Sequence, residues 1–214
     1  ALAQGSAGLN YSWAIFGPAL KQRFHLNEVQ LTSVASLGFN MGGYFALFAG
    51  LTYDALGRHN HIGPRTAMAV GACLLCLGYS GIYSLATGLI PYSYHLLLLF
   101  AFLGGNSGCW FDTTALATCV QNFPDNRGVI VGVLKSFLGL TATIYSAIYM
   151  AAFAPDAISF VLFIAIAPSI FALVLACFIN KVPLEYHELC PAKANEVDGH
   201  SSGHTDGHTS SQPG

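Results

Sequence analysis

The stretch that decides the fold class is ISFVLFIAIAPSIFALVLACFI, which runs from Ile158 to Ile179. It contains 22 residues and no charged side chain. A helix rises about 1.5 Å per residue, so this length is enough to cross the roughly 30 Å hydrocarbon core of a bilayer. The stretch therefore predicts a transmembrane helix.

Further apolar stretches of similar length precede it, separated by short polar breaks. We place them at about Leu2 to Leu20, Val29 to Leu51, Thr66 to Thr87, Tyr94 to Val120 and Val129 to Phe153. The composition agrees, because 54% of the 214 residues are hydrophobic, only 8% are charged and the mean hydropathy is +0.55. The sequence predicts an all-α polytopic membrane protein with a six-helix transmembrane domain over residues 1–182.

The remainder of the chain, residues 183–214, has a different character. It is rich in Ser, Gly, His and acidic residues and offers almost nothing to bury, which is typical of a disordered tail or linker. His200, His204 and His208 are spaced four apart, and neutral imidazoles bind zinc and copper. A solvated linker is the preferred interpretation, a weak metal site is the alternative, and no cofactor is expected.

The positions of lysine and arginine predict the orientation in the membrane. With six spans both termini share one side, and the loops of that side carry most of the basic residues: Arg58, Arg65, Arg127, Lys181 and Lys193. The opposite loops hold Lys21 and Arg23, so the positive-inside rule places both termini in the cytoplasm. The net charge of −2 leaves no basic surface for nucleic acid, which we exclude as a partner.

Small residues recur at four-residue spacing inside the predicted spans. The pairs are Gly38 with Gly42, Gly104 with Gly108, and Gly128 with Gly132. In a membrane, such pairs let helix backbones approach closely. We expect all three pairs to lie at helix contacts.

Two charges lie deep inside apolar stretches, Asp112 and Lys135. An unpaired charge costs about 2.5 to 3.5 kcal/mol at a helix centre on insertion scales. The two residues lie almost symmetrically about the predicted turn near Phe123 and Pro124, each roughly 13 Å from it along its helix. They can therefore pair. They could bind or couple a substrate, or form a structural ion pair, or Lys135 could extend towards the cytoplasm.

Four neutral polar residues also lie near the middle of predicted spans. They are Asn10, Tyr11, Asn40 and Asn106. An amide or a phenol in an apolar span needs a hydrogen-bond partner, and that partner can be a substrate or another helix. Both interpretations stay open for each of the four.

The stretch GLTYDALGRHN, Gly50 to Asn60, lies between the second and third predicted spans. We expect a short cytoplasmic turn there, with Gly50 and Gly57 allowing a tight reversal. The spacing resembles the loop signature of the major facilitator superfamily of transporters. That resemblance implies that Asp54 acts as a gating residue with Arg58 as its companion. Arg127, near the next cytoplasmic turn, could reach Asp54 or the carbonyl end of span four.

A longer stretch narrows this resemblance. FLGGNSGCWFDTTALATCVQNFPDNRGVIVGVLKSFLGL, Phe102 to Leu140, resembles the nodulin-like family of that superfamily. The resemblance implies the N-terminal six-helix half of a secondary transporter that moves a small solute by alternating access. Its partners would be the lipid bilayer, the solute and a second six-helix half, supplied by a longer chain or by a second copy.

The sequence also allows two other functions to be considered. GNSG, Gly105 to Gly108, resembles the nucleophile motif of intramembrane serine proteases, but the fifth and sixth predicted spans contain no histidine to activate Ser107. We therefore expect no enzyme. The other alternative is a truncated membrane-embedded fragment with an interaction or regulatory role and no transport activity.

Overall fold

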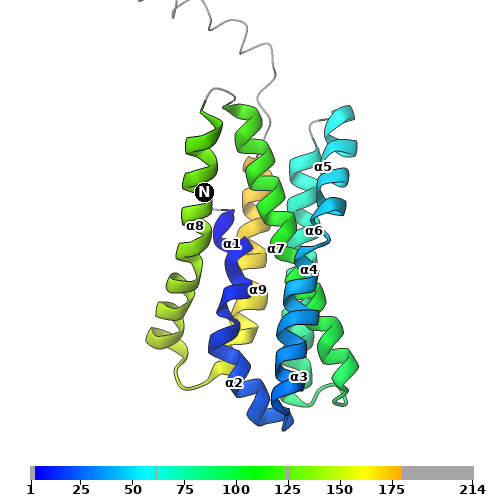
Figure 1. The fold of residues 1–214 in the computed structure, drawn as a ribbon, viewed down its shortest axis with the longest axis vertical. Helices are drawn as coiled ribbons and strands as arrows, with labels where there is room; N and C mark the ends of the chain where they lie inside the picture. Colours follow the sequence, from blue (N-terminus) through cyan, green and yellow to red (C-terminus); the bar gives the residue numbers. More distant parts are fainter. Residues whose placement is uncertain (1–2, 61, 124–125, 180–214) are drawn as a thin grey trace, which may run out of the picture. The chain divides into compact units, whose positions relative to one another are not determined.

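The computed structural model describes residues 3–60, 62–123 and 126–179, and the regular structure of these residues is entirely helical (Figure 1). The side chains of residues 57–60 lie outside this description. The described residues form six helical rods. In chain order these are α1 (Gln4–Ala7) with the 3₁₀ turn η1 (Gly8–Ser12) and α2 (Trp13–Phe24); α3 (Glu28–Ser33) with the π-helix η2 (Val34–Asn40), α4 (Met41–Gly43) and α5 (Ala46–Asn60); α6 (Gly63–Thr87); α7 (Tyr94–Asn122); α8 (Arg127–Ile148) with the π-helix η3 (Tyr149–Phe153); and α9 (Ala157–Phe178).

The prediction of an all-α polytopic membrane protein is confirmed. Four helical stretches are long and apolar enough to cross a membrane: Glu28–Leu56, Gly63–Thr87, Arg127–Phe153 and Ala157–Phe178. α7 has 29 residues, which is also sufficient length, but its centre carries Asn106, Ser107 and Asp112. The count of six transmembrane helices stays a prediction.

The structure differs from the turn expected at Gly50 to Asn60. This stretch is the last part of α5, and the chain reverses after it. The physical reason is that Leu51, Ala55 and Leu56 are good helix formers, and glycine lowers helix stability by only about 1 kcal/mol relative to alanine. Gly50 has open space around its Cα, so it serves no close approach within the described chain.

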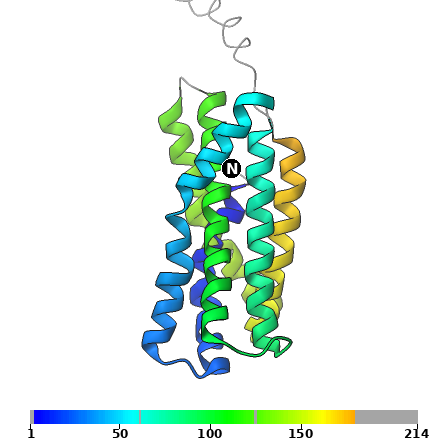
Figure 2. The same ribbon diagram turned by 90° about the vertical axis from the view of Figure 1, so that its right-hand side faces the viewer.

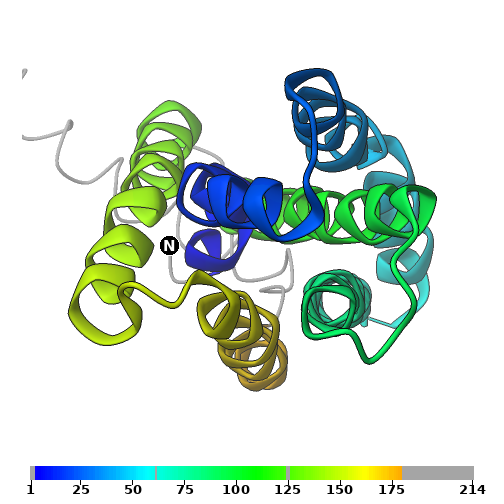
Figure 3. The same cartoon turned by 90° about the horizontal axis from the view of Figure 1, so that it is seen from below.

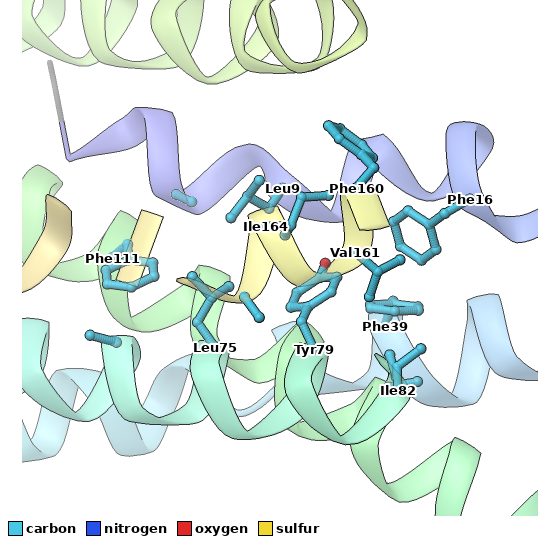
Figure 4. Close-up of a cluster of buried hydrophobic side chains, with 14 of the residues drawn as sticks. Leu9, Phe16, Phe39, Leu75, Tyr79, Ile82, Phe111, Phe160, Val161 and Ile164 are labelled. Carbon is cyan, nitrogen blue, oxygen red and sulfur yellow. The ribbon is translucent and has the colours of Figure 1, made fainter. Parts of the chain in front are cut away.

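The centre of the bundle is an aromatic cluster that joins the first three rods (Figure 4). Phe16, Phe39 and Tyr79 are at most 1% exposed. Their ring centroids are 5.8 to 6.0 Å apart, in edge-to-face or tilted pairs. Contacts of this kind add about 0.5 to 1.5 kcal/mol each beyond area burial, so the cluster fixes how α2, η2 and α6 meet.

α7 lies between the α3–α5 rod and α6, and glycine allows it to approach both (Figure 2). A Cβ on Gly42 would meet the backbone of Gly105 at 2.6 Å, and a Cβ on Gly78 would meet the Cα of Gly104 at 2.6 Å. Two of the three predicted glycine pairs are thus at helix contacts.

The third predicted glycine pair, Gly128 with Gly132, is not at a contact within the described chain. A Cβ on either residue would meet no described atom within 4 Å. α8 lies at the edge of the bundle beside the first rod (Figure 3). Residue spacing alone therefore did not distinguish a packed glycine face from an open one.

Helix ends are tied by polar side chains. Arg23 Nε donates to the carbonyl of Ala86 at 2.9 Å, which satisfies the end of α6. At the start of α9, Asp156 accepts hydrogen bonds from the backbone N–H groups of Ile158 and Ser159 at 3.1 and 3.2 Å. These bonds and that of the Ser159 hydroxyl lower the pKa of the Asp156 carboxyl.

Candidate functional site

A cavity of about 300 Å³ lies among the first, second, fourth and fifth rods. Four of the six residues predicted to meet a substrate line it: Asn10, Tyr11, Asn40 and Asp112. The other lining residues are Ala7, Phe39, Gly43, Ala46, Gly105, Gly108, Cys109, Thr113 and Leu138. Residues from distant parts of the chain thus form one polar cavity inside an apolar bundle.

The Asp112–Lys135 pair forms the charged part of this region. Lys135 Nζ lies 2.8 Å from both carboxylate oxygens of Asp112, so the contact predicted across the turn between α7 and α8 is present. The Asp112 side chain is 30% exposed and the Lys135 side chain is 44% exposed, so neither charge is fully buried in the bundle. Asp112 lines the cavity, whereas Lys135 lies directly beside Asp112 without lining the cavity.

A third residue, Gln4, completes the cluster and was missed at the sequence level. Its Nε2 donates to Asp112 Oδ1 at 2.9 Å, and its side chain is fully buried. Thr141 Oγ1 on α8 donates to the Gln4 carbonyl at 3.3 Å, which ties the start of the first rod to α8. The signal was available, because an amide inside the first predicted span needs a partner as much as Asn10 does.

Asn10 lies further along the first rod than Gln4, and its side chain bonds to α7. Its Nδ2 donates to the carbonyl of Gly105 at 3.2 Å, which leaves its amide oxygen for another partner. Gly108 lets the rods approach, since a Cβ there would lie 2.8 Å from the Ala7 carbonyl oxygen. This close contact places the first rod directly beside Asp112.

Tyr11 and Asn40 are exposed on the cavity wall. Tyr11 is 62% exposed, and neither side chain has a hydrogen-bond partner among residues 3–60, 62–123 and 126–179. Asn40 is the last residue of the π-helix η2, an element that is common at functional sites. Both groups are free to bond a solute.

The structure does not bring Asn106 to the cavity. Its side chain is 8% exposed, and its Oδ1 accepts a hydrogen bond from Trp110 Nε1 at 2.7 Å. Trp110 lies one turn further along α7, so a local partner satisfies the amide. The amide oxygen of Asn106 therefore bonds within its own helix, and a substrate role for Asn106 stays a prediction.

Tyr11 also belongs to a second cavity, of about 510 Å³. The first and fifth rods supply its other walls: Ala14, Ile15, Ala142, Thr143, Ser146, Ala147 and Met150. These are mostly small residues without charge. Tyr11 therefore stands between a small polar cavity and a larger neutral one.

The predicted gating residues lie at the end of α5 and the start of α8. Asp54 and Arg127 are both exposed, and neither forms an ion pair with another described residue. The side chains of Gly57 and Arg58 lie outside the described residues, as do His200, His204 and His208. Gating by Gly50, Asp54, Gly57, Arg58 and Arg127 stays a prediction.

Ser107 of the GNSG stretch is fully buried within α7. Its hydroxyl donates to the carbonyl of Gly104 in the preceding turn, at 2.6 Å. This is the ordinary way in which a helix satisfies a buried serine. The geometry supports a packing role for Ser107.

Comparison with known proteins identifies a family that this chain matches. The profile of the Nodulin-like family matches residues 1–200. The chain is also similar to Protein NUCLEAR FUSION DEFECTIVE 4 of Arabidopsis thaliana, with 29% identity over 143 residues. That region is 67% of this chain but 23% of the relative, so the match covers less than a quarter of the relative's length.

Proposed function

The chain belongs to the Nodulin-like family, and from this membership and the geometry of its cavity we propose that it forms part of a secondary transporter for a small polar solute. The observation that carries the proposal is the cavity of about 300 Å³ lined by Asn10, Tyr11, Asn40 and Asp112. It lies inside an integral membrane protein and takes its walls from four separate rods. Small-molecule sites have this combination of an apolar frame and a few convergent polar groups.

Placing these polar side chains inside a membrane protein is energetically unfavourable, which supports a role in binding a solute rather than in packing alone. Polar and charged residues inside a membrane are expensive and normally find partners. Tyr11 and Asn40 have no hydrogen-bond partner among the described residues, although Asn106 and Ser107 each have one. A solute that binds Tyr11 and Asn40 would supply the hydrogen-bond partners that these side chains lack among the described residues.

A transporter of this kind works with a second bundle. Substrate sites in such proteins lie near the bilayer midplane between two structural repeats, and rocking of one repeat against the other exposes the site to each side in turn. The second half would come from a longer chain or from a second copy of this one. With both termini in the cytoplasm, Asp54 and Arg58 at the end of α5 would latch the two halves on that side. The chain itself would catalyse no covalent chemistry.

Alternating exposure can be tested without knowing the solute. In a variant whose native cysteines are replaced by alanine, Thr113→Cys puts one thiol on the cavity wall, and Leu173→Cys puts a control thiol on the exposed face of α9. Each is reconstituted together with the second six-helix half in vesicles of known sidedness and treated with a membrane-impermeant thiol reagent from one side at a time.

We expect the thiol at position 113 to react from both sides and the thiol at position 173 to react from neither. Reaction of the cavity thiol from one side only would contradict alternating access. That result would favour the alternative of a membrane-embedded protein with an interaction or regulatory role.

A further inference from the structure

We infer that the solute of this cavity is a zwitterion, a small molecule that carries one ammonium and one carboxylate group. The inference rests on the proposed function and names the substrate class of the same site. It follows from the bonding capacity that the Asp112–Lys135 pair leaves unused.

The lysine has one hydrogen-bond donor to spare. An ammonium group carries three N–H donors. Two of those of Lys135 point to Asp112 Oδ1 and Oδ2, each at 2.8 Å. The third has no acceptor among the described residues, and the side chain is 44% exposed. A carboxylate of a solute can accept from it.

The aspartate has one acceptor position to spare. Each carboxylate oxygen accepts about two hydrogen bonds. Oδ1 already accepts from Lys135 and from Gln4, whereas Oδ2 accepts from Lys135 alone. Asp112 lines the cavity, so an ammonium group of a solute can donate to Oδ2. Lys135 does not itself line the cavity, but its Nζ lies 2.8 Å from both carboxylate oxygens of Asp112, which does. The pair thus places one donor and one acceptor side by side at the edge of the cavity.

The net charge of the site favours a solute that is neutral overall. Asp112 and Lys135 cancel, and Asp112 is the only charged residue in the described cavity lining. A lone carboxylate could bind only the spare donor of Lys135, and a lone amine only the spare acceptor of Asp112, so either would bring a net charge that no other residue of the described lining compensates. An uncompensated charge inside an apolar bundle is unfavourable. A zwitterion completes a ring of alternating charges and leaves the pair intact.

The rest of the cavity sets the size and polarity of the solute. Its volume of about 300 Å³ is at the lower end for small-molecule sites, which suits a compound of amino-acid size. Phe39 and Leu138 supply apolar wall, and Tyr11 and Asn40 supply neutral hydrogen-bonding groups. These groups fit an uncharged side chain beside the two charged groups.

The test uses three compounds with one carbon skeleton. Leucine carries both charges, 4-methylpentanoate lacks the ammonium group, and 3-methylbutylamine lacks the carboxylate. Binding of each to the purified full chain in lipid nanodiscs is measured by titration calorimetry, together with binding of the smaller zwitterion alanine. We expect leucine to bind at least tenfold more tightly than either singly charged compound.

The variant Asp112→Asn/Lys135→Met removes both charges without leaving one unpaired, and we expect it to fold and to lose the preference for leucine. The matched control is Lys21→Met/Glu28→Gln, which removes the ion pair of Lys21 and Glu28 away from the cavity and should leave binding unchanged. Binding of the acid or the amine within threefold of leucine would overturn the inference, as would failure of both zwitterions to bind.

The two proposals can fail separately. If a singly charged compound binds best while the thiol at position 113 is still reached from both sides, transport stands and the zwitterion is wrong. If leucine binds tightly while that thiol is reached from one side only, the zwitterion site stands and the transport proposal falls.

Discussion

α6 and the α8–η3 rod have the same mean hydropathy, 1.6, over their most apolar windows, and similar lengths of 25 and 27 residues. They differ in burial, because 50% of the α6 window is buried within the described chain and only 11% of the α8–η3 window is. Hydropathy therefore identifies a helix that can cross a membrane, but it does not say how many protein neighbours that helix has.

Shape explains the difference. Gly71, Gly78 and Gly81 of α6 all face α7, where an added Cβ would approach described atoms within 3.0 Å or less. Gly128, Gly132 and Gly139 of α8 have no described atom within 4 Å of such a Cβ. In lipid, close backbone approach supplies much of the association energy. α6 thus packs closely against α7 through its own glycines. α8 contacts the first rod, where a Cβ on Gly8 would lie 2.9 Å from the Leu138 carbonyl oxygen, and it forms the polar contacts of Lys135 and Thr141.

The largest expected effect comes from filling a glycine position on α6. Gly78→Leu forces a side chain into the backbone of Gly104, and we expect it to destabilise the fold by about 3 kcal/mol or more. Gly132→Leu on α8 should leave stability unchanged or raise it, because leucine is the better helix former. Melting of the two detergent-purified variants, followed by size-exclusion fluorescence, makes the comparison. Equal melting temperatures would contradict the assignment of α6 as the packed helix.

The next largest effect is expected from breaking the ion pair that joins Lys135 of α8 to Asp112 of α7. We expect Asp112→Asn and Lys135→Met to lower the free energy of unfolding by about 2 to 3 kcal/mol each, because each leaves a charge unpaired in the membrane. The double variant should be more stable than either single variant. Its stability is measured in the same melting assay, and a double variant as unstable as the sum of the singles would exclude the pairing.

Gln4 gives a smaller effect on the same attachment. Gln4→Leu removes a hydrogen bond to a carboxylate, and we expect a loss of about 1.5 kcal/mol. Gln4→Glu should be worse, because it places a second carboxylate against Asp112. Protein yield in membranes and melting temperature report both variants. If Gln4→Glu is the more stable of the two, Gln4 does not donate to Asp112.

The smallest effect concerns how the helices begin. Asp156→Ala should cost about 1 kcal/mol, because Asp156 caps α9. α8 starts at Asn126 without a side-chain cap bond, so Asn126→Ala should be nearly neutral. The melting temperatures of the two alanine variants give this comparison.

The cap also has a pH dependence. The pKa of Asp156 is lowered in the folded chain, so its charge-dependent stabilisation is fully present above the ordinary aspartate pKa of about 3.9 and is lost as the pH falls through the lowered value. Asp156→Asn, which can still cap without charge, should reduce that dependence. An unchanged difference between wild type and Asp156→Asn from pH 7 to pH 3 would exclude a charged cap.

Much of the helix pattern could be predicted because long apolar runs are visible directly in the sequence. The ends of α7, of α9 and of the α8–η3 rod agree with the predicted spans to within two residues. The end of α5 does not agree, because Gly50 and Gly57 favour a turn in a stretch whose other residues favour helix. An apolar run without a polar face does not indicate which side of the helix is buried. The low burial of α8 within the described chain could therefore not be predicted.

The site was predictable to a similar degree. Asp112 and Lys135 stand out because charge is rare in the spans, and their symmetrical spacing about the turn was enough to pair them. The bond between Asn106 and Trp110 could not be predicted, because both residues lie on the same helix and tryptophan was counted as an apolar residue. Gln4 was missed because it stands near the start of the first span, where a polar residue attracts little notice.

The length of α7 has a consequence for the surrounding lipid. Its 29 residues extend about 44 Å, whereas the 22 residues of α9 extend about 33 Å and the hydrocarbon core measures about 30 Å. As a predicted span, α7 would have to tilt or project into the headgroups, and in a thin bilayer each Å of mismatch would lower its stability by a fraction of a kcal/mol. Acyl-chain length should therefore influence both the stability of this bundle and the membrane in which it accumulates.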